Sequence, residues 1–217
     1  MPHYILLTGA GFSRNWGGWL ANEAFEYLLG CPKVSSELLW RHKAQGGFEA
    51  AYDELQTEAG KPHRSVALLN EATDFSVAIR AMFGDMNKAF VSVPFEFENR
   101  TQYLIRNFLV RFDAIFTLNQ DLLMEQCYLN GNVTSSSYRQ WSGWQMPGMR
   151  PWPGQGNPQP IDTKWSPKQR AEFVVEKNQQ PFFKLHGSSN WFAEVNGEPM
   201  LIIGGNKASA IDRFDIL

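Results

Sequence analysis

Cysteine is scarce in this chain, which has two in 217 residues, Cys31 and Cys127, and no Cys-x-x-Cys pair. A zinc site built from four thiolates is therefore excluded, because such a site needs four cysteines. A structural disulfide is not expected in a cytosolic chain. We expect a protein without a bound metal.

Long apolar runs and an excess of charge of one sign are also missing. No run of roughly 18 apolar residues occurs, and no basic region precedes an apolar segment at the amino terminus. The 20 Lys and Arg residues nearly balance the 22 Asp and Glu residues, so the formal net charge is −2. Nucleic-acid-binding proteins usually carry a basic surface. We therefore expect a cytoplasmic protein that binds neither nucleic acid nor a membrane.

Short apolar segments alternate with segments of helical periodicity, which is typical of α/β proteins. We expect strands at residues 4–8, 114–118, 181–185 and 200–203. We expect a loop at 9–18 and helices at 19–29, 65–90, 101–108 and 121–128, with two short helices between 36 and 60. The sequence thus predicts one α/β domain over residues 1–217, with a Rossmann-like, doubly wound and mostly parallel sheet.

Two long segments interrupt this alternation. Residues 31–98 are mainly helical in pattern and are expected to form an insertion between the first two strands of the sheet. Residues 130–160 are rich in Gly, Pro, Ser and Trp and are expected to form a long loop. A connection of that length is either functional or mobile.

A polar turn follows each of three expected strands, at residues 8–13, 117–121 and 185–188. In open α/β sheets, ligands bind in the crevice beyond the carboxyl ends of the strands. The three turns are therefore expected to meet around one pocket.

The first turn contains Gly9, Ala10, Gly11, Phe12 and Ser13. Small residues between a strand and a helix let backbone N–H groups approach a phosphate, although glycines serve ordinary tight turns equally well. No Gly-Lys-Ser/Thr follows, so the turn is not a Walker A loop, and its spacing does not match the dehydrogenase fingerprint.

The other two turns each allow a structural and a functional interpretation. Asn119 and Asp121 suit helix capping, which is the simpler interpretation of each residue alone. His186 could form a hydrogen bond with neighbouring backbone, or its neutral imidazole could accept a proton near neutral pH. Gly187 would let the chain turn sharply beside the imidazole ring.

Taken in order, the three turns resemble the sirtuin superfamily. Sirtuins carry a Gly-Ala-Gly-x-Ser turn, a Thr-Gln-Asn-x-Asp strand end and a His-Gly pair, and here Leu118 replaces the usual Gln. The stretch from Leu185 to Trp191 is most similar to the sirtuin-like NAD hydrolases of prokaryotic antiphage defence. The specific matches are confined to these short stretches.

The resemblance implies roles for individual residues. Asn119 and His186 would be catalytic, with the Asn119 amide against the nicotinamide ribose or the attacking water and His186 acting as base. Asp121 would hold the nicotinamide carboxamide. The remaining residues expected to bind NAD are Gly9, Ala10, Gly11, Phe12, Ser13, Gly187 and Ser188.

The chain departs from sirtuin deacylases at two points. It has no four-cysteine zinc module after the His-Gly pair, and it has no Pro-Asp-Phe-Arg segment to cover the nicotinamide. Trp16 could stack on the nicotinamide or belong to the core. Related proteins also continue beyond the point that corresponds to Leu217, so we expect the C-terminal part of the domain to be missing.

These features predict an NAD hydrolase that releases nicotinamide and ADP-ribose. A non-hydrolytic module that senses NAD or ADP-ribose is the alternative, and an NAD-dependent protein deacylase ranks lower. Constant NAD cleavage would exhaust the cell, so we expect regulation by homo-oligomerisation or by a sensor or ATPase subunit. The Trp- and Pro-rich stretch from Trp141 to Trp165 is the expected contact or gating surface.

Without a thiolate cluster, the fold should not depend on zinc. We predict that EDTA leaves the thermal unfolding midpoint of the purified protein unchanged. Differential scanning calorimetry with and without the chelator measures this. Stoichiometric zinc whose removal lowers the midpoint would contradict the prediction.

Overall fold

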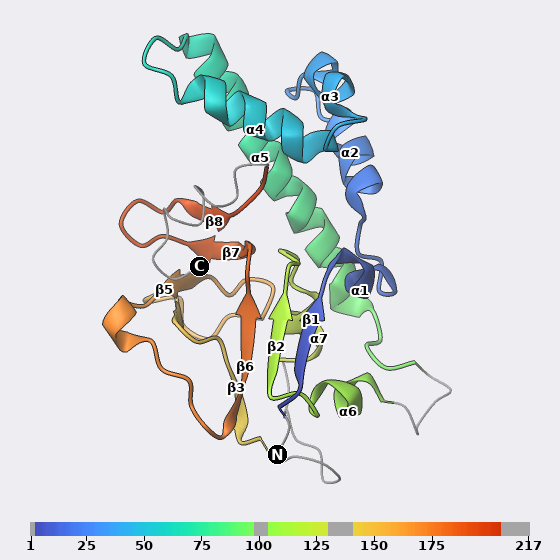
Figure 1. Cartoon of the computed structure of the whole chain (residues 1–217), viewed down its shortest axis with the longest axis vertical. Coiled ribbons are helices and arrows are strands. Elements are labelled where there is room, and N and C mark those ends of the chain that lie inside the picture. Colours follow the sequence, from blue (N-terminus) through green and yellow to red (C-terminus); the bar gives the residue numbers. More distant parts are fainter. Residues whose placement is uncertain (1–2, 98–103, 130–140, 205–217) are drawn as a thin grey trace.

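The structure is a computed structural model that describes residues 3–97, 104–129 and 141–204. Most of the α-helices lie in the first half of the chain, between β1 and β2, and most of the strands follow in the second half (Figure 1). In order, the elements are β1 (Ile5–Thr8), α1 (Ala10–Arg14), α2 (Ala21–Leu29), α3 (Ser36–His42), α4 (Gly47–Ala59), α5 (Val66–Ala89), α6 (Ile105–Leu109), β2 (Ala114–Thr117), α7 (Leu123–Cys127), β3 (Gly143–Gln145), β4 (Met149–Pro151), β5 (Trp165–Pro167), β6 (Gln179–Lys184), β7 (Gly187–Phe192) and β8 (Pro199–Leu201). Short 3₁₀ turns occur at Phe90–Ser92 and Arg170–Glu172.

The main sheet has four strands in the order β1-β2-β6-β3, and every neighbouring pair is parallel. Leu7 pairs with Phe116, which in turn pairs with Phe183. The carboxyl ends of β1, β2 and β6 therefore lie at one edge, and in Figure 1 they point toward α1 and the lower end of α5. The expected α/β fold with a parallel sheet is confirmed.

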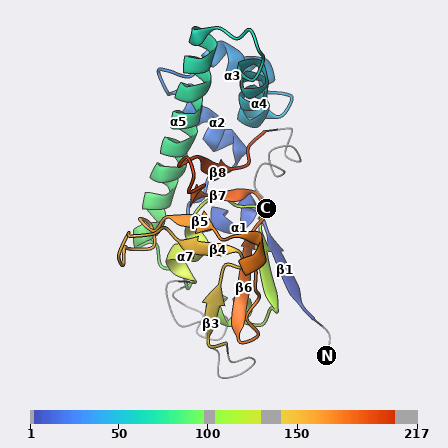
Figure 2. The ribbon, with the colours of Figure 1, turned by 90° about the vertical axis from the view of Figure 1, so that its left-hand side faces the viewer.

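A second sheet, β4-β5-β7-β8, lies beside the carboxyl end of β6 (Figure 2). β7 begins at Gly187, three residues after the last residue of β6. Gly187 has a φ of +70°, and a Cβ at this position would lie 1.8 Å from the Met200 carbonyl oxygen. The sequence analysis did not predict β7, because its Gly-Ser-Ser-Asn start lacks the apolar alternation of a strand.

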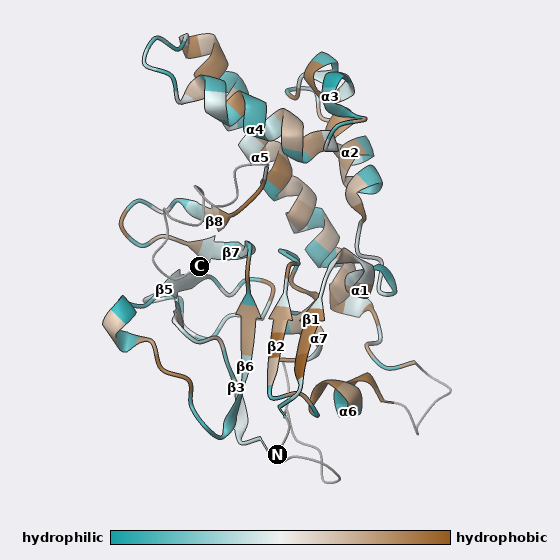
Figure 3. Cartoon of the chain, viewed as in Figure 1, coloured by the Kyte–Doolittle hydropathy of each residue, from teal (hydrophilic) through white to brown (hydrophobic). Residues whose placement is uncertain are grey.

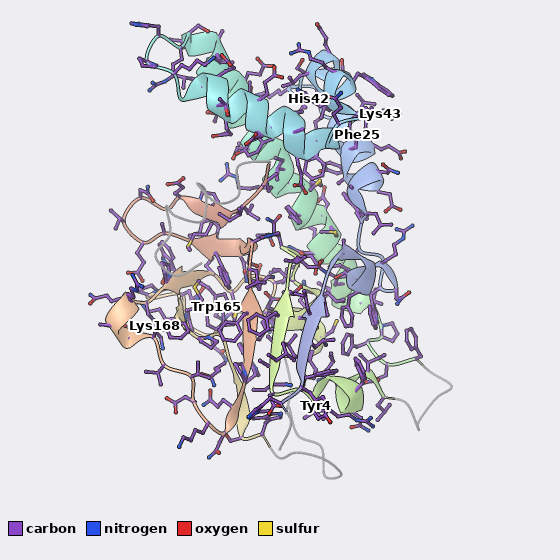
Figure 4. All side chains as sticks on the ribbon, viewed as in Figure 1. Tyr4, Phe25, His42, Lys43, Trp165 and Lys168 are labelled. Carbon is purple, nitrogen blue, oxygen red and sulfur yellow. The ribbon has the colours of Figure 1, made fainter. Side chains whose placement is uncertain are left out.

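Between β1 and β2 the chain forms a group of helices that extends away from the sheet (Figures 1 and 2). The predicted helix at residues 65–90 is confirmed as α5, which the Ser65 hydroxyl caps by accepting from Leu68 N. Along α5, Phe75, Ile79, Met82 and Met86 are buried at helical spacing. Within this group, the Lys43 ammonium lies over the Phe25 ring at 5.8 Å (Figure 4). The buried stripe fixes α5, whose last turn reaches the turn after β2 through Asn87.

The two faces of the main sheet differ in burial. Ile115 and Phe182 are buried on the face toward α7, whereas Ile5 and Leu7 on the other face are 62% and 60% exposed. Phe116 and Phe183 stack on that second face with centroids 4.7 Å apart. β1 and β2 colour as hydrophobic in Figure 3. The described helices leave the β1 part of this face uncovered, although parallel sheets usually have both faces covered.

Two sequence predictions about loops were wrong. Residues 10–14 form helix α1, although a loop was expected over residues 9–18. Gly9 is extended, and of the glycines in this segment only Gly17 has a positive φ, so Gly11 takes ordinary helical backbone angles. Part of the expected loop at 130–160 forms β3 and β4 through pairing with distant strands. Residues 130–140, part of the expected helix at 101–108, and residues 205–217 lie outside the described residues.

Among the described residues, no helix is both long enough and apolar enough to span a membrane.

Among the described glycines, Gly187 should be the one at which the fold least tolerates a side chain. We predict that Gly187→Ala lowers the free energy of unfolding by about 3 kcal/mol or more, because positive φ and the Met200 carbonyl both oppose a Cβ. Gly11→Ala is the matched control, since no atom lies within 4 Å of its added Cβ, and should change stability by less than about 1 kcal/mol. Urea unfolding measures both. Equal stability of the two variants would contradict the prediction.

Candidate functional site

Backbone hydrogen bonds hold the three predicted turns side by side. Leu118 N donates to the Thr8 carbonyl at 3.0 Å, and Leu185 N donates to the Thr117 carbonyl at 2.9 Å. These bonds continue the parallel pairing one residue beyond the strands. The turns after β1, β2 and β6 therefore start next to one another.

The first two turns are also joined through side chains. The Asn119 amide nitrogen donates to Ser13 Oγ at 2.8 Å, although 106 positions separate these residues. Ser13 is 2% exposed and lies near the Asp121 carboxyl, where it opposes the rise in pKa that burial causes, while Asn119 is half-buried. The structure thus brings Ser13, Asn119 and Asp121 together at one point of the sheet edge.

The third turn is attached through Gln120, which the sequence analysis did not select. Gln120 Nε2 donates to the His186 carbonyl at 3.1 Å and to the Ile202 carbonyl at 2.7 Å, and the Gln120 carbonyl accepts from Ser189 N at 2.9 Å. The His186 carbonyl also accepts from Ile202 N at 3.0 Å. The His186 backbone is fixed beside the Asn119 turn, and its side chain is partly exposed.

The predicted site residues differ in their access to a ligand. Ala10 and Gly11 are exposed at the start of α1, where the first N–H groups of a helix have no partner within it. Ser13, Asp121, Gly187 and Ser188 are buried, and within the described part of the chain the Ser188 hydroxyl has no hydrogen-bond partner. In this conformation the open surface of the site is formed by the first turn, Asn119 and His186.

The aromatic residues near α1 belong to the core. Trp16 is 4% exposed, donates from Nε1 to the Phe95 carbonyl at 3.0 Å, and packs against Phe12 with centroids 5.3 Å apart. Of the two interpretations of Trp16, core packing therefore describes this structure. Phe12 is half-buried beside it.

A buried charge cluster lies beneath the site. The Lys184 ammonium, on β6, donates to Glu125 Oε1 at 2.7 Å and to the Asp121 carbonyl at 2.5 Å. Burial raises the pKa of the Asp121 and Glu125 carboxyls, while the nearby Lys184 ammonium opposes that rise. Sequence reasoning missed Lys184 and Glu125, because Lys184 stands in an apolar strand and pairs with a residue 59 positions away.

Helix α5 contributes Asn87 to the same region. Its side-chain oxygen accepts from Leu122 N at 2.8 Å and its side-chain nitrogen donates to Ser189 Oγ at 3.0 Å. Gln126 Nε2 donates to the Asn87 carbonyl at 3.0 Å. The long helix is thereby bonded both to the turn after β2 and to β7.

A cavity of about 670 Å³ lies between α4, α5 and β8, and its lining includes Ile202, which is hydrogen-bonded to the His186 carbonyl. None of the predicted site residues lines it. Its polar lining includes Asp53, Arg64 and Arg80, and its apolar lining includes Leu69 and Ile203. Its volume alone does not make it the functional site, because the predicted polar residues meet elsewhere, at the carboxyl edge where α/β sheets bind ligands.

The described residues contain no group of three or more His, Cys, Asp or Glu side chains placed to hold a metal. The arrangement instead offers backbone donors, an oriented carboxamide and an imidazole at the sheet edge. These groups can bind an anion, orient a hydroxyl and move a proton.

The chain matches no model of a known protein family, and a search of curated proteins finds no significant relative.

Proposed function

We propose that this chain is a sirtuin-like enzyme that hydrolyses NAD at the bond between nicotinamide and ribose. The observation that carries the proposal is the Ser13–Asn119 contact beside the His186 turn, at the carboxyl edge of a parallel sheet. Three turns that resemble those of sirtuins in sequence are neighbours in space. An accidental resemblance of short motifs would not require this proximity.

The diphosphate of NAD would bind at the start of α1. Gly9 and Gly11 have no atom within 4 Å of an added Cβ, which leaves open space beside the backbone. The exposed N–H groups of Ala10 and Gly11 can donate to phosphate oxygens there. The nicotinamide ribose would then extend toward Asn119 and His186.

The departure of nicotinamide needs little help from an acid. The nicotinamide of NAD is cationic and departs as a neutral molecule when the bond to the ribose C1′ breaks, leaving oxocarbenium character on the sugar. A water oxygen adds to C1′, and the His186 imidazole accepts the proton that this water loses. Asn119 orients the ribose or the water. The products are nicotinamide and ADP-ribose.

The proposal includes finer features of the fold and its context. The main sheet would be a doubly wound Rossmann-like sheet, and the helices between β1 and β2 would be an insertion into it. The protein would act in the cytoplasm as a conditional antiphage effector, switched on by self-assembly or by a sensor or ATPase subunit. The Trp-rich stretch supports a contact surface only in part, because Trp141 is 5% exposed and Trp144 packs on Trp165 at 5.9 Å.

Replacing His186 tests the base. In the assembled, active protein, we predict that His186→Gln and Asn119→Ala each lower the rate of NAD hydrolysis by about 10²–10⁴. His63→Gln is the control, because His63 is exposed on the turn between α4 and α5. Chromatography of released nicotinamide and ADP-ribose measures the rates. A folded His186→Gln variant within a few-fold of wild type would refute the assignment of the base.

A side chain at Gly11 tests the phosphate position. We predict that Gly11→Val weakens ADP-ribose binding by at least about tenfold, because it separates the phosphate from the N–H donors. Gly84→Val is the matched control, since Gly84 is also helical and has open space around it. Calorimetric titration compares the two. Unchanged affinity in Gly11→Val would place the diphosphate elsewhere.

A further inference from the structure

Asp121 lies at the centre of a hydrogen-bond network under the candidate site. Its carboxylate accepts from Leu123 N at 3.0 Å and lies near the Ser13 hydroxyl, which opposes the rise in its pKa that burial causes. Its backbone carbonyl accepts from the Lys184 ammonium at 2.5 Å. Both its side chain and its backbone are therefore held by buried groups.

Ser13 relays this constraint to Asn119. The Ser13 hydroxyl oxygen accepts from the Asn119 amide nitrogen at 2.8 Å, and the same hydroxyl lies near the Asp121 carboxyl, where it opposes the rise in pKa that burial causes. The Asn119 backbone N–H is held separately, by Thr117 Oγ1 at 3.0 Å. With its amide nitrogen committed to Ser13, the Asn119 side chain has its carbonyl oxygen left to accept a hydrogen bond from a ribose hydroxyl or a water.

Burying the Lys184 ammonium costs desolvation free energy. The Lys184 side chain is fully buried, and Glu125 Oε2 beside it has no hydrogen-bond partner among the described residues. Well-packed apolar residues often replace a buried ion pair without loss of stability. A role confined to stability would therefore not require a charge at this position, where the ammonium holds the Asp121 carbonyl in the turn after β2.

We propose that Lys184 and Asp121 are positioning residues of the NAD site: Lys184 fixes the turn after β2, and Asp121 acts through Ser13 to aim the Asn119 carbonyl oxygen at the substrate. This inference rests on the proposed function. It also gives Ser13 and Asp121 a different task from the direct ligand contacts that the sirtuin resemblance implies.

The same strand provides a matched control for Lys184. Gln180 lies near the opposite end of β6, is 1% exposed, and donates to the Leu109 carbonyl at 2.8 Å and the Phe112 carbonyl at 3.0 Å. It holds backbone carbonyls as Lys184 does, but far from Asn119. Gln180→Met should therefore affect stability without affecting the site.

The side-chain amide signals of Asn119 in a ¹H–¹⁵N NMR spectrum report its orientation without any need for activity. We expect Ser13→Ala and Lys184→Met to shift these signals and Gln180→Met to leave them in place. Should Lys184→Met not fold, Lys184→Met/Glu125→Leu removes both charges and serves in its place. Unchanged Asn119 signals in both a folded Lys184 variant and Ser13→Ala would overturn the proposal.

Kinetics distinguish positioning from ligand contact. If Ser13 acts only through Asn119, Ser13→Ala should lower kcat by about tenfold or more in the wild-type background, with little change in KM or in ADP-ribose affinity. It should have no further effect on kcat in the Asn119→Ala background. A loss of ADP-ribose affinity in Ser13→Ala, or an additional loss of kcat in the double variant, would overturn the relay. Absence of NAD hydrolysis by the wild type would refute the proposed function, and the NMR comparison would still decide on the network.

Discussion

The parallel pairing of β1, β2 and β6 is the constraint on which the rest of this structure depends. Parallel strands end at the same edge, so the pairing of Thr8 with Thr117 and of Thr117 with Lys184 makes three distant turns adjacent. The register also matters, because strand side chains alternate between faces and a slip by one residue would turn Lys184 to the opposite face. The contacts among Ser13, Asn119, Asp121 and Lys184 all require this alignment.

The groups at the edge combine an open surface with a rigid base. Ala10 and Gly11 are exposed and Asn119 is half-buried, whereas Ser13 and Thr117, which bond to Asn119, are buried. Asn87 adds a connection from α5, which extends into the helices above the sheet. Because of this hydrogen bond, a movement of α5 would displace the turn after β2.

Much of the fold could be predicted from local patterns. The β-branched and apolar run of β2 and the buried stripe of α5 are visible in the sequence because burial imposes periods of 2 and 3.6 residues. Helix α1 and strand β7 were missed for the opposite reason. Glycines suggested a loop where the backbone is an ordinary helix, and β7 is specified by pairing with β5 and β8 rather than by its own composition.

The site was only partly predictable in the same way. The motifs located Ser13, Asn119 and His186, since strand ends and small residues leave a local signal. Lys184, Glu125, Asn87 and Gln120 gave no such signal, because each acts through partners far away in the chain. The sequence also left Trp16 open between stacking and core, and only its contacts with Phe95 and Phe12 decide the matter.

The position of bound ADP-ribose tests the central claim most directly. A crystal structure of the protein with this product should place the diphosphate against the N–H groups at the start of α1 and the terminal ribose beside Asn119 and His186. The cavity between α4, α5 and β8 is the main competing location in the described part of the chain. ADP-ribose bound there, with the strand-end turns empty, would contradict the proposed site.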